Sequence, residues 1–209
     1  MTFNLAQTAS ILTIMRTFLA AAAVLLISLA PARAAPSRQD IADLDRISAA
    51  LSAIHTLKGD FTQLDPNGAV EHGEVYIRKP GKMRFEYTPP STLLVVSDGI
   101  DVAVFNKKLD TADRYPLSTT PLNLLLSDHV NLRESKYVVG IERQPGQIVV
   151  HARSNDRRVT GNITIVFSDP GLQLKQWTVV DAQGLSTTVT LGNMQTGVAL
   201  QPALFLTHG

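Results

Sequence analysis

The sequence predicts a mainly β protein of the α+β class, in which helices cover one antiparallel sheet of ten or eleven strands. Most segments after residue 57 alternate apolar and polar residues, and alternation with period two is typical of a strand with one buried face. Short turn sequences such as Asp-Pro-Asn-Gly, Lys-Pro-Gly and Gln-Gly separate these segments, so tight hairpins should join neighbouring strands. Helical patterns occur in two places, near the N-terminus and in mid-chain.

The first 34 residues predict a cleaved signal peptide. Arg16 precedes an uncharged apolar run over residues 17–30, and the small-x-small triplet Ala32-Arg33-Ala34 follows it. This is the order of a basic region, an apolar region and a cleavage site. Met15 is an alternative start, and an uncleaved membrane anchor is the alternative role for the run. Cleavage would leave an exported single domain, residues 35–209.

The composition excludes several classes of partner. The chain has 19 basic and 18 acidic residues, and removal of the leader takes Arg16 and Arg33 with it, so the mature domain is slightly acidic. We expect no nucleic-acid partner, because neutralising phosphates requires a basic surface. The chain also has no cysteine, which excludes disulfides and a lipid-modified N-terminal cysteine.

Residues 40–57 predict an amphipathic helix. Asp40 suits the N-cap position, and Gly59 follows the last periodic residue and should end the helix. The apolar residues recur at spacings of three and four, as one face of a helix requires. They are Ile41, Leu44, Ile47, Leu51, Ile54 and Leu57.

Ten segments that follow this helix predict strands. They are residues 58–64, 70–79, 82–88, 92–97, 100–106, 137–143, 147–153, 162–168, 172–181 and 185–192. Residues 119–127, with the sequence Thr-Thr-Pro-Leu-Asn-Leu-Leu-Leu-Ser, interrupt the series. Proline suits a first helical position, so we expect one or two helical turns there. A helix this rich in leucine should cover something apolar.

No catalytic motif supports an enzyme, and we expect neither a metal nor another cofactor. His72-Gly73-Glu74 matches half of a zinc deaminase signature, but the cysteine half is missing. Glu71, Glu74 and Glu86 lie on neighbouring predicted strands and could pair for acid–base catalysis. Their alternation with apolar residues favours a solvated strand face instead.

The segment Lys-Met-Arg-Phe-Glu-Tyr, residues 82–87, places Met83, Phe85 and Tyr87 on one face of a strand. Residues 93–96 form a continuous apolar run, and Phe105 follows on the next predicted strand. Two interpretations are open. These residues could form a closed core, which the pattern alone favours, or they could line an apolar cavity with the leucine-rich helix as its lid.

The order of motifs over residues 40–206 resembles the LolA-type outer-membrane lipoprotein carriers. Residues 73–106 are similar to the family pattern of a strand, basic-Pro-Gly-Lys-aromatic-Arg-aromatic, a proline, and Val-Ser-Asp-Gly. Weaker similarities occur in Leu-Lys-Gly-Asp-Phe-Thr-Gln, in the leucine-rich segment, and in the last strands with the closing Pro-x-x-Phe. The matching residues in the main stretch are Pro80, Gly81, Lys82, Arg84, Phe85, Tyr87, Pro90, Val96, Ser97, Asp98 and Gly99.

The resemblance implies an incomplete antiparallel β-barrel, closed by the N-terminal helix and a short helical lid around a hydrophobic cavity. It also implies a monomeric periplasmic carrier without a cofactor. Such a carrier takes acylated lipoproteins from an inner-membrane lipoprotein-releasing transporter to an outer-membrane receptor or to the outer membrane itself. Two alternatives on the same fold are a lipid or glycolipid chaperone and a regulatory module that senses lipoproteins.

The pattern and the resemblance together predict three sets of site residues. The cavity wall is expected to contain Met83, Phe85, Tyr87, Leu94, Val96 and Phe105. The lid is expected to contain Leu122, Leu124 and Leu125. The family commonly has an arginine before the proline, where it hydrogen-bonds the lid, whereas this chain has Lys79 with Arg78 before it. We expect Lys79 or Arg78 to hold the lid, although lysine lacks the planar fork of a guanidinium.

Overall fold

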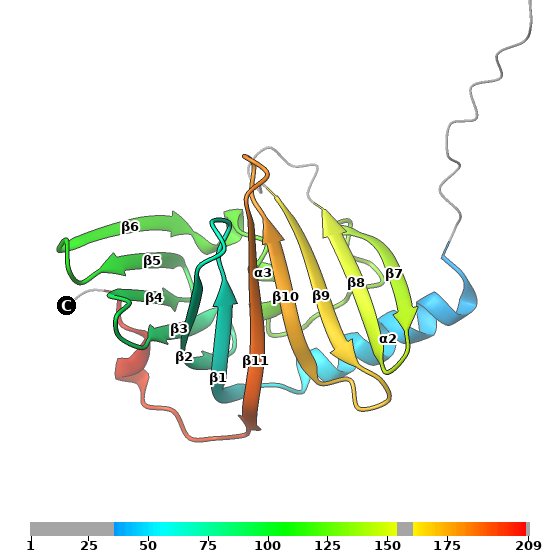
Figure 1. The fold of residues 1–209 in the computed structure, drawn as a ribbon. Coiled ribbons are helices and arrows are strands. Elements are labelled where there is room, and N and C mark those ends of the chain that lie inside the picture. Colours follow the sequence, from blue (N-terminus) through cyan, green and yellow to red (C-terminus); the bar gives the residue numbers. More distant parts are fainter. Residues whose placement is uncertain (1–35, 154–160, 208–209) are drawn as a thin grey trace, which may run out of the picture. The chain divides into compact units, whose positions relative to one another are not determined.

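The computed structural model describes residues 36–153 and 161–207, so the predicted signal peptide lies outside the described residues (Figure 1). The described chain contains eleven strands, two α-helices and two short 3-10 helices. They are α2 (Arg38–Ser52), β1 (Thr56–Leu64), β2 (Val70–Arg78), β3 (Lys82–Tyr87), β4 (Leu93–Asp98), β5 (Asp101–Asn106), β6 (Thr111–Pro116), η1 (Leu117–Thr119), α3 (Asn123–Leu126), β7 (Val138–Gln144), β8 (Gln147–Arg153), β9 (Asn162–Ser168), β10 (Leu174–Val180), β11 (Ser186–Thr196) and η2 (Pro202–Phe205).

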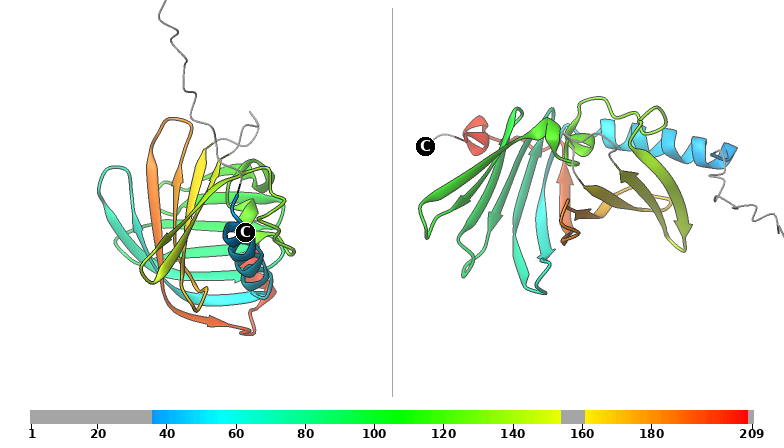
Figure 2. Two further views of the ribbon diagram at one scale, coloured as in Figure 1. Left: turned by 90° about the vertical axis from the view of Figure 1, so that its right-hand side faces the viewer. Right: turned by 90° about the horizontal axis from the view of Figure 1, so that it is seen from above.

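All strands belong to one antiparallel sheet in the order β6-β5-β4-β3-β2-β1-β11-β10-β9-β8-β7. The first and last strands pair in the middle of the sheet, with Phe61 opposite Leu191, and β6 and β7 form its two edges. Figure 2 shows the sheet curving around α2 and α3, which lie on its inner side. The predicted incomplete antiparallel barrel is therefore confirmed.

Helix α2 packs Leu44, Ile47 and Leu51 into the core on the inner side of the sheet. The helix begins and ends earlier than the sequence predicts. Ser37 is its N-cap, because the Ser37 hydroxyl accepts from the Asp40 amide while the Asp40 carboxylate accepts from the Ser37 amide. The helix ends at Ser52, and Leu57 belongs instead to β1, where strand alternation also buries it.

Ion pairs join α2 to the edge strand β7. Arg143 on β7 donates to Asp40 at 2.8 Å and, through two nitrogens, to the buried Asp43, each at 2.8 Å. Arg46 also contacts Asp43 at 2.8 Å. The helix is thus fixed across the open side of the sheet by charged groups as well as by its apolar face.

Strand β6 was not among the segments that the sequence predicts as strands. All six of its residues are exposed, so the segment shows no alternation of apolar and polar residues. Asp113, Arg114 and Pro116 are typical of an edge strand that is protected against pairing with other chains. Among the described residues, no helix has the length and apolar character that crossing a bilayer requires.

Candidate functional site

Four aromatic side chains, which we call the aromatic wall, meet on the inner face of the sheet. Phe61 on β1 packs edge-to-face against Phe85 and Tyr87 on β3, with ring centroids 4.8 and 5.0 Å apart. Trp177 on β10 contacts Phe85 in the same manner at 6.0 Å. Edge-to-face contacts are the favoured arrangement for such rings. The strands that flank the β1–β11 seam therefore build one continuous apolar surface.

Met83, Phe85 and Tyr87 all point into this surface and are buried, as the alternation in β3 predicts. The Tyr87 hydroxyl donates to Gln63 at 2.7 Å, which satisfies its polar atom at the edge of the wall. Burial raises the pKa of Tyr87, so this hydroxyl keeps its proton at physiological pH.

The other three predicted wall residues lie on the opposite face of the sheet. In the register of β3 and β4, Phe85 pairs with Val95, and paired residues share a face. Leu93 and Val95 therefore lie on the inner face, while Leu94 pairs with Phe105 on the outer face and Val96 joins them. The prediction that Leu94, Val96 and Phe105 line the cavity is wrong, because a continuous apolar run does not reveal which residues share a face.

A C-terminal segment covers this outer face. Helix η2 packs on β3 and β4, and its Phe205 is buried. Arg84 donates to the Leu204 carbonyl at 3.3 Å, and Arg114 donates to the Thr207 carbonyl at 2.6 Å. The apolar run of β4 is thus covered on both sides, which explains why it lacks alternation.

Helix α3 covers the inner apolar surface, where the sequence predicts a lid; that it moves as a lid stays a prediction. Leu125 and Leu126 are buried, and Leu122 and Leu124 are partly buried against the core. Leu126 was not among the predicted lid residues, yet its carbonyl accepts from the Gly81 amide at 2.8 Å. This backbone hydrogen bond joins the end of α3 directly to the turn between β2 and β3.

The space beneath α3 is almost filled. The remaining cavity has a volume of about 20 Å³, which is room for about one water molecule. An acyl chain would therefore have to displace α3. The cavity is lined by Leu51, Ile54, Leu57, Ile77, Lys79, Met83, Leu122, Leu125, Leu126, Leu174 and Trp177.

Lys79 holds α2 in this structure and does not hold the lid. Its ammonium group donates to the Leu51 carbonyl at 2.7 Å, in the last turn of α2, which contains no basic residue of its own. A cation stabilises the carbonyl end of a helix. Burial lowers the pKa of Lys79 to about 8, while the Asp128 carboxylate acts in the opposite direction. Arg78 forms no hydrogen bond or ion pair with the described residues of the lid.

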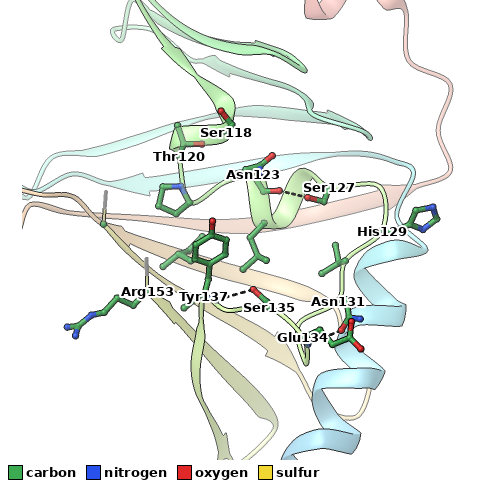
Figure 3. Close-up of a pocket in the computed structure, with 16 residues that line it drawn as sticks. Ser118, Thr120, Asn123, Ser127, His129, Asn131, Glu134, Ser135, Tyr137 and Arg153 are labelled. Atoms are coloured by element: carbon green, nitrogen blue, oxygen red, sulfur yellow. Dashed lines mark hydrogen bonds between the residues drawn. The ribbon is translucent and has the colours of Figure 1, made fainter. Parts of the chain in front are cut away.

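A larger pocket of about 320 Å³ lies on another side of α3 (Figure 3). Its apolar part comes from Leu124, Val130, Ala152 and Ile163. Its polar part comes from η1 and the residue after it, from α3, from the loop between α3 and β7, and from the end of β8. These polar residues are Ser118, Thr120, Asn123, Ser127, His129, Asn131, Glu134, Ser135, Tyr137 and Arg153. We call this space the polar pocket; no sequence pattern had indicated it.

Two of the three carboxylates considered for acid–base chemistry, Glu74 and Glu86, are engaged in local pairs on the outer face, while one oxygen of the third, Glu71, is buried without a hydrogen-bond partner among the described residues. Glu74 accepts from Tyr76 at 2.7 Å and pairs with Lys58 at 3.1 Å, and both interactions lower the pKa of Glu74. Glu86 pairs with Arg84 at 3.0 Å. Within residues 36–153 and 161–207, no group of three or more metal-binding side chains is placed to hold an ion.

The chain is similar to several known proteins. The family model described as outer membrane lipoprotein carrier protein LolA matches residues 52–208. An outer-membrane lipoprotein carrier protein of Methylococcus capsulatus is 29% identical over 180 residues, which cover 81% of this chain and 85% of that protein. A second, from Chromobacterium violaceum, is 28% identical over 194 residues, or 90% of each chain. The crystal structure of a LolA superfamily protein from Nitrosomonas europaea covers 78% of this chain and 97% of its own, with 12% identity and a TM-score of 0.43.

Proposed function

Because the chain belongs to the LolA family of outer membrane lipoprotein carrier proteins, we propose that it carries lipoproteins across the periplasm with their acyl chains bound beneath α3. The cargo would come from an inner-membrane lipoprotein-releasing transporter. It would pass to an outer-membrane receptor or to the outer membrane itself.

The observation that carries this proposal is the pairing of a leucine-rich lid with the aromatic wall. Exposing an acyl chain to water costs about 0.8 kcal/mol per methylene, so a chain of about fifteen methylenes needs shielding of roughly 12 kcal/mol. The surface formed by Phe61, Phe85 and Trp177 offers such shielding once the leucines of α3 leave it.

The lid can be displaced at modest cost because α3 is short. It contains four residues, and a helix of this length has little stability apart from its packing. Acyl chains and the side chains of Leu122, Leu125 and Leu126 would compete for the same apolar surface. Binding then shifts the population toward an open lid, and return of the lid favours release of the cargo.

The direct test is the substitution Phe85→Glu, which places a charge on the aromatic wall. We expect the variant to lose co-purification of a tagged, acylated lipoprotein, because a buried unpaired carboxylate excludes an apolar ligand. Val70→Glu is the matched control, since Val70 is an exposed apolar residue on the neighbouring strand β2. Circular dichroism would establish that both variants fold. Undiminished recovery with Phe85→Glu would contradict the proposal.

The two alternative functions are separated by what the protein carries. We expect mass spectrometry of protein purified from the periplasm without detergent to detect acylated lipoprotein peptides. Bound phospholipid or glycolipid would instead support a lipid chaperone, and an empty cavity would support a sensor of lipoproteins. Depletion of the protein in cells should leave lipoproteins in the inner membrane, which fractionation would measure.

A further inference from the structure

We infer that the groove between the tips of the β1–β2 and β10–β11 hairpins binds the polypeptide that follows the acylated residue of the cargo. The inference rests on the proposed function and extends it from the acyl chains to the peptide that carries them. A phospholipid has no polypeptide, so this groove gives the protein a means of distinguishing acylated peptides from lipids with the same chains. We call the groove the notch; it is lined by Leu64, Asp65 and Pro66 on one side and by Leu185, Ser186 and Thr188 on the other.

The notch lies where the central seam of the sheet ends. The register of β1 and β11 ends at the pair of Leu64 and Thr188, whereas β11 continues to pair with β10 as far as Ser186. In the described chain, Ser186 and Thr187 therefore have a strand neighbour on one side only. The tips of the two hairpins point the same way (Figure 1), and the open space between them has a volume of about 420 Å³.

The open edge of β11 suits an extended polypeptide. The N–H and C=O groups on the edge of a sheet pair readily with another chain, and such pairing gives affinity through the main chain. Two leucines flank this edge from the two hairpins, and Leu64 and Leu185 are 46% and 52% exposed. A peptide in the notch would cover both of them while it pairs with the edge.

The notch is continuous with the aromatic wall. Val189 pairs with Trp177 on β10 and with Gln63 on β1, so these three residues share the inner face. The Tyr87 hydroxyl of the wall donates to Gln63 at 2.7 Å, and the Gln63 carboxamide donates to Asp65 in the notch at 2.7 Å. Gln63 directly precedes the first residue of the notch, and successive residues of a strand lie about 3.3 Å apart. Acyl chains on the wall would therefore place the attached peptide at the notch.

The polar side chains of the notch can bind a peptide backbone. One oxygen of the Asp65 carboxylate accepts from Gln63, and an ionised carboxylate can accept further hydrogen bonds from peptide amides. The Ser186 hydroxyl can donate to a peptide carbonyl or accept from a peptide amide. Such contacts do not depend on the side chains of the bound segment, which suits a carrier of several lipoproteins.

The test compares three compounds that share one tripalmitoylated cysteine and differ only in the tail. The first is the cysteine amide without a tail, the second has a neutral peptide tail of about six residues, which spans about 20 Å when extended, and the third has the same tail with every amide N-methylated. Each competes with a fluorescent fatty acid for the full-length mature protein. We expect the unmodified tail to tighten binding by about tenfold, because it covers two exposed leucines and pairs with the strand edge. The N-methylated tail should give little of this gain, because its amides cannot donate to the edge.

The double variant Leu64→Ser, Leu185→Ser should reduce the gain from the tail to about threefold or less and should keep its affinity for the compound without a tail. The matched control is Ile100→Ser, Leu109→Ser, which removes two exposed apolar side chains from the β4–β5 and β5–β6 turns and should keep the full gain. Equal binding of the tailed and tail-free compounds by the wild type would overturn the inference while the carrier function stands. So would a full gain from the N-methylated tail, an unchanged gain in Leu64→Ser, Leu185→Ser, or an equal loss of gain in the control. If the wild type bound none of the three compounds, the proposed function itself would fail, and the inference with it.

Discussion

Replacing Leu126 with alanine should raise the affinity for acyl chains, because it weakens the closed lid with which they compete. Leu126 is 2% exposed, and the change removes about three buried carbon atoms. At about 0.8 kcal/mol for each, the closed state loses roughly 2 kcal/mol. Since each 1.4 kcal/mol is a factor of ten, the fraction of open molecules should rise by about 30-fold.

The apparent dissociation constant falls in proportion to the fraction of molecules that can bind. We therefore expect up to about 30-fold tighter binding of a fluorescent fatty acid, measured by titration at a temperature where the variant is fully folded. The melting temperature should fall as well, by about 4–8 °C for roughly 2 kcal/mol in a domain of this size, because the closed lid is part of the folded state that the change destabilises.

Leu132→Ala is the control, because Leu132 is fully buried in the same core but lies outside α3. This change should lower the melting temperature and leave the affinity unchanged. If Leu126→Ala lowered the melting temperature as much as Leu132→Ala and had no effect on affinity, α3 would be a fixed part of the core and the reasoning would fail.

Two further predictions concern the groups that hold α2. Burial lowers the pKa of Lys79 to about 8 from the ordinary 10.5, so between these pH values the unfolded chain holds a proton that the folded chain has lost. The free energy of unfolding, compared with that of Lys79→Met, should therefore rise with pH over this window. The expected rise is about 1 kcal/mol, after allowance for the partial exposure of Lys79. Below pH 8 both the folded and the unfolded chain hold the proton, so the difference in free energy of unfolding between wild type and Lys79→Met should be constant. Urea unfolding of both proteins from pH 7 to about pH 10.5 measures this difference. A difference that stays constant over the whole range would contradict the prediction. Arg143→Leu should lower the free energy of unfolding by about 2 kcal/mol, because the buried Asp43 loses two charged donors. Arg133→Leu breaks the exposed ion pair with Asp45 and should lower the free energy of unfolding by about 0.5 kcal/mol or less. If urea unfolding showed equal losses for Arg143→Leu and Arg133→Leu, the burial of Asp43 would not be what makes its ion pair important.

The sequence alone predicts which residues of an element are buried where one face of that element packs on the core and the other carries charged residues. Alternation in β3 placed Met83, Phe85 and Tyr87 on the inner face because the charged residues between them face solvent. It failed in β4, where both faces are covered by other parts of the chain. The outer face of that strand packs against η2, which lies about a hundred residues away in the chain, so the alternation that would reveal its inner face is missing.

The remaining differences have similar physical causes. Strand β6 has two exposed faces and therefore no pattern to detect. The end of α2 was misplaced because Leu57 fits both the spacing of the helix and the alternation of β1. The position of Lys79 indicated a contact near the lid. Its hydrogen-bond partner is instead the Leu51 carbonyl in the last turn of α2, and this partner could be predicted only if the end of α2 were known.

The pairing of β1 with β11 has a consequence for how the chain folds. The strands β1 to β6 form one local meander and β7 to β11 form another, and the sheet becomes whole only when residues far apart in sequence, such as Leu64 and Thr188, meet at the central seam. Contacts between distant residues form slowly because the intervening loop must first close. The strand that completes the middle of the sheet, β11, follows the other ten in the chain, so the sheet cannot be completed until β11 has been synthesised.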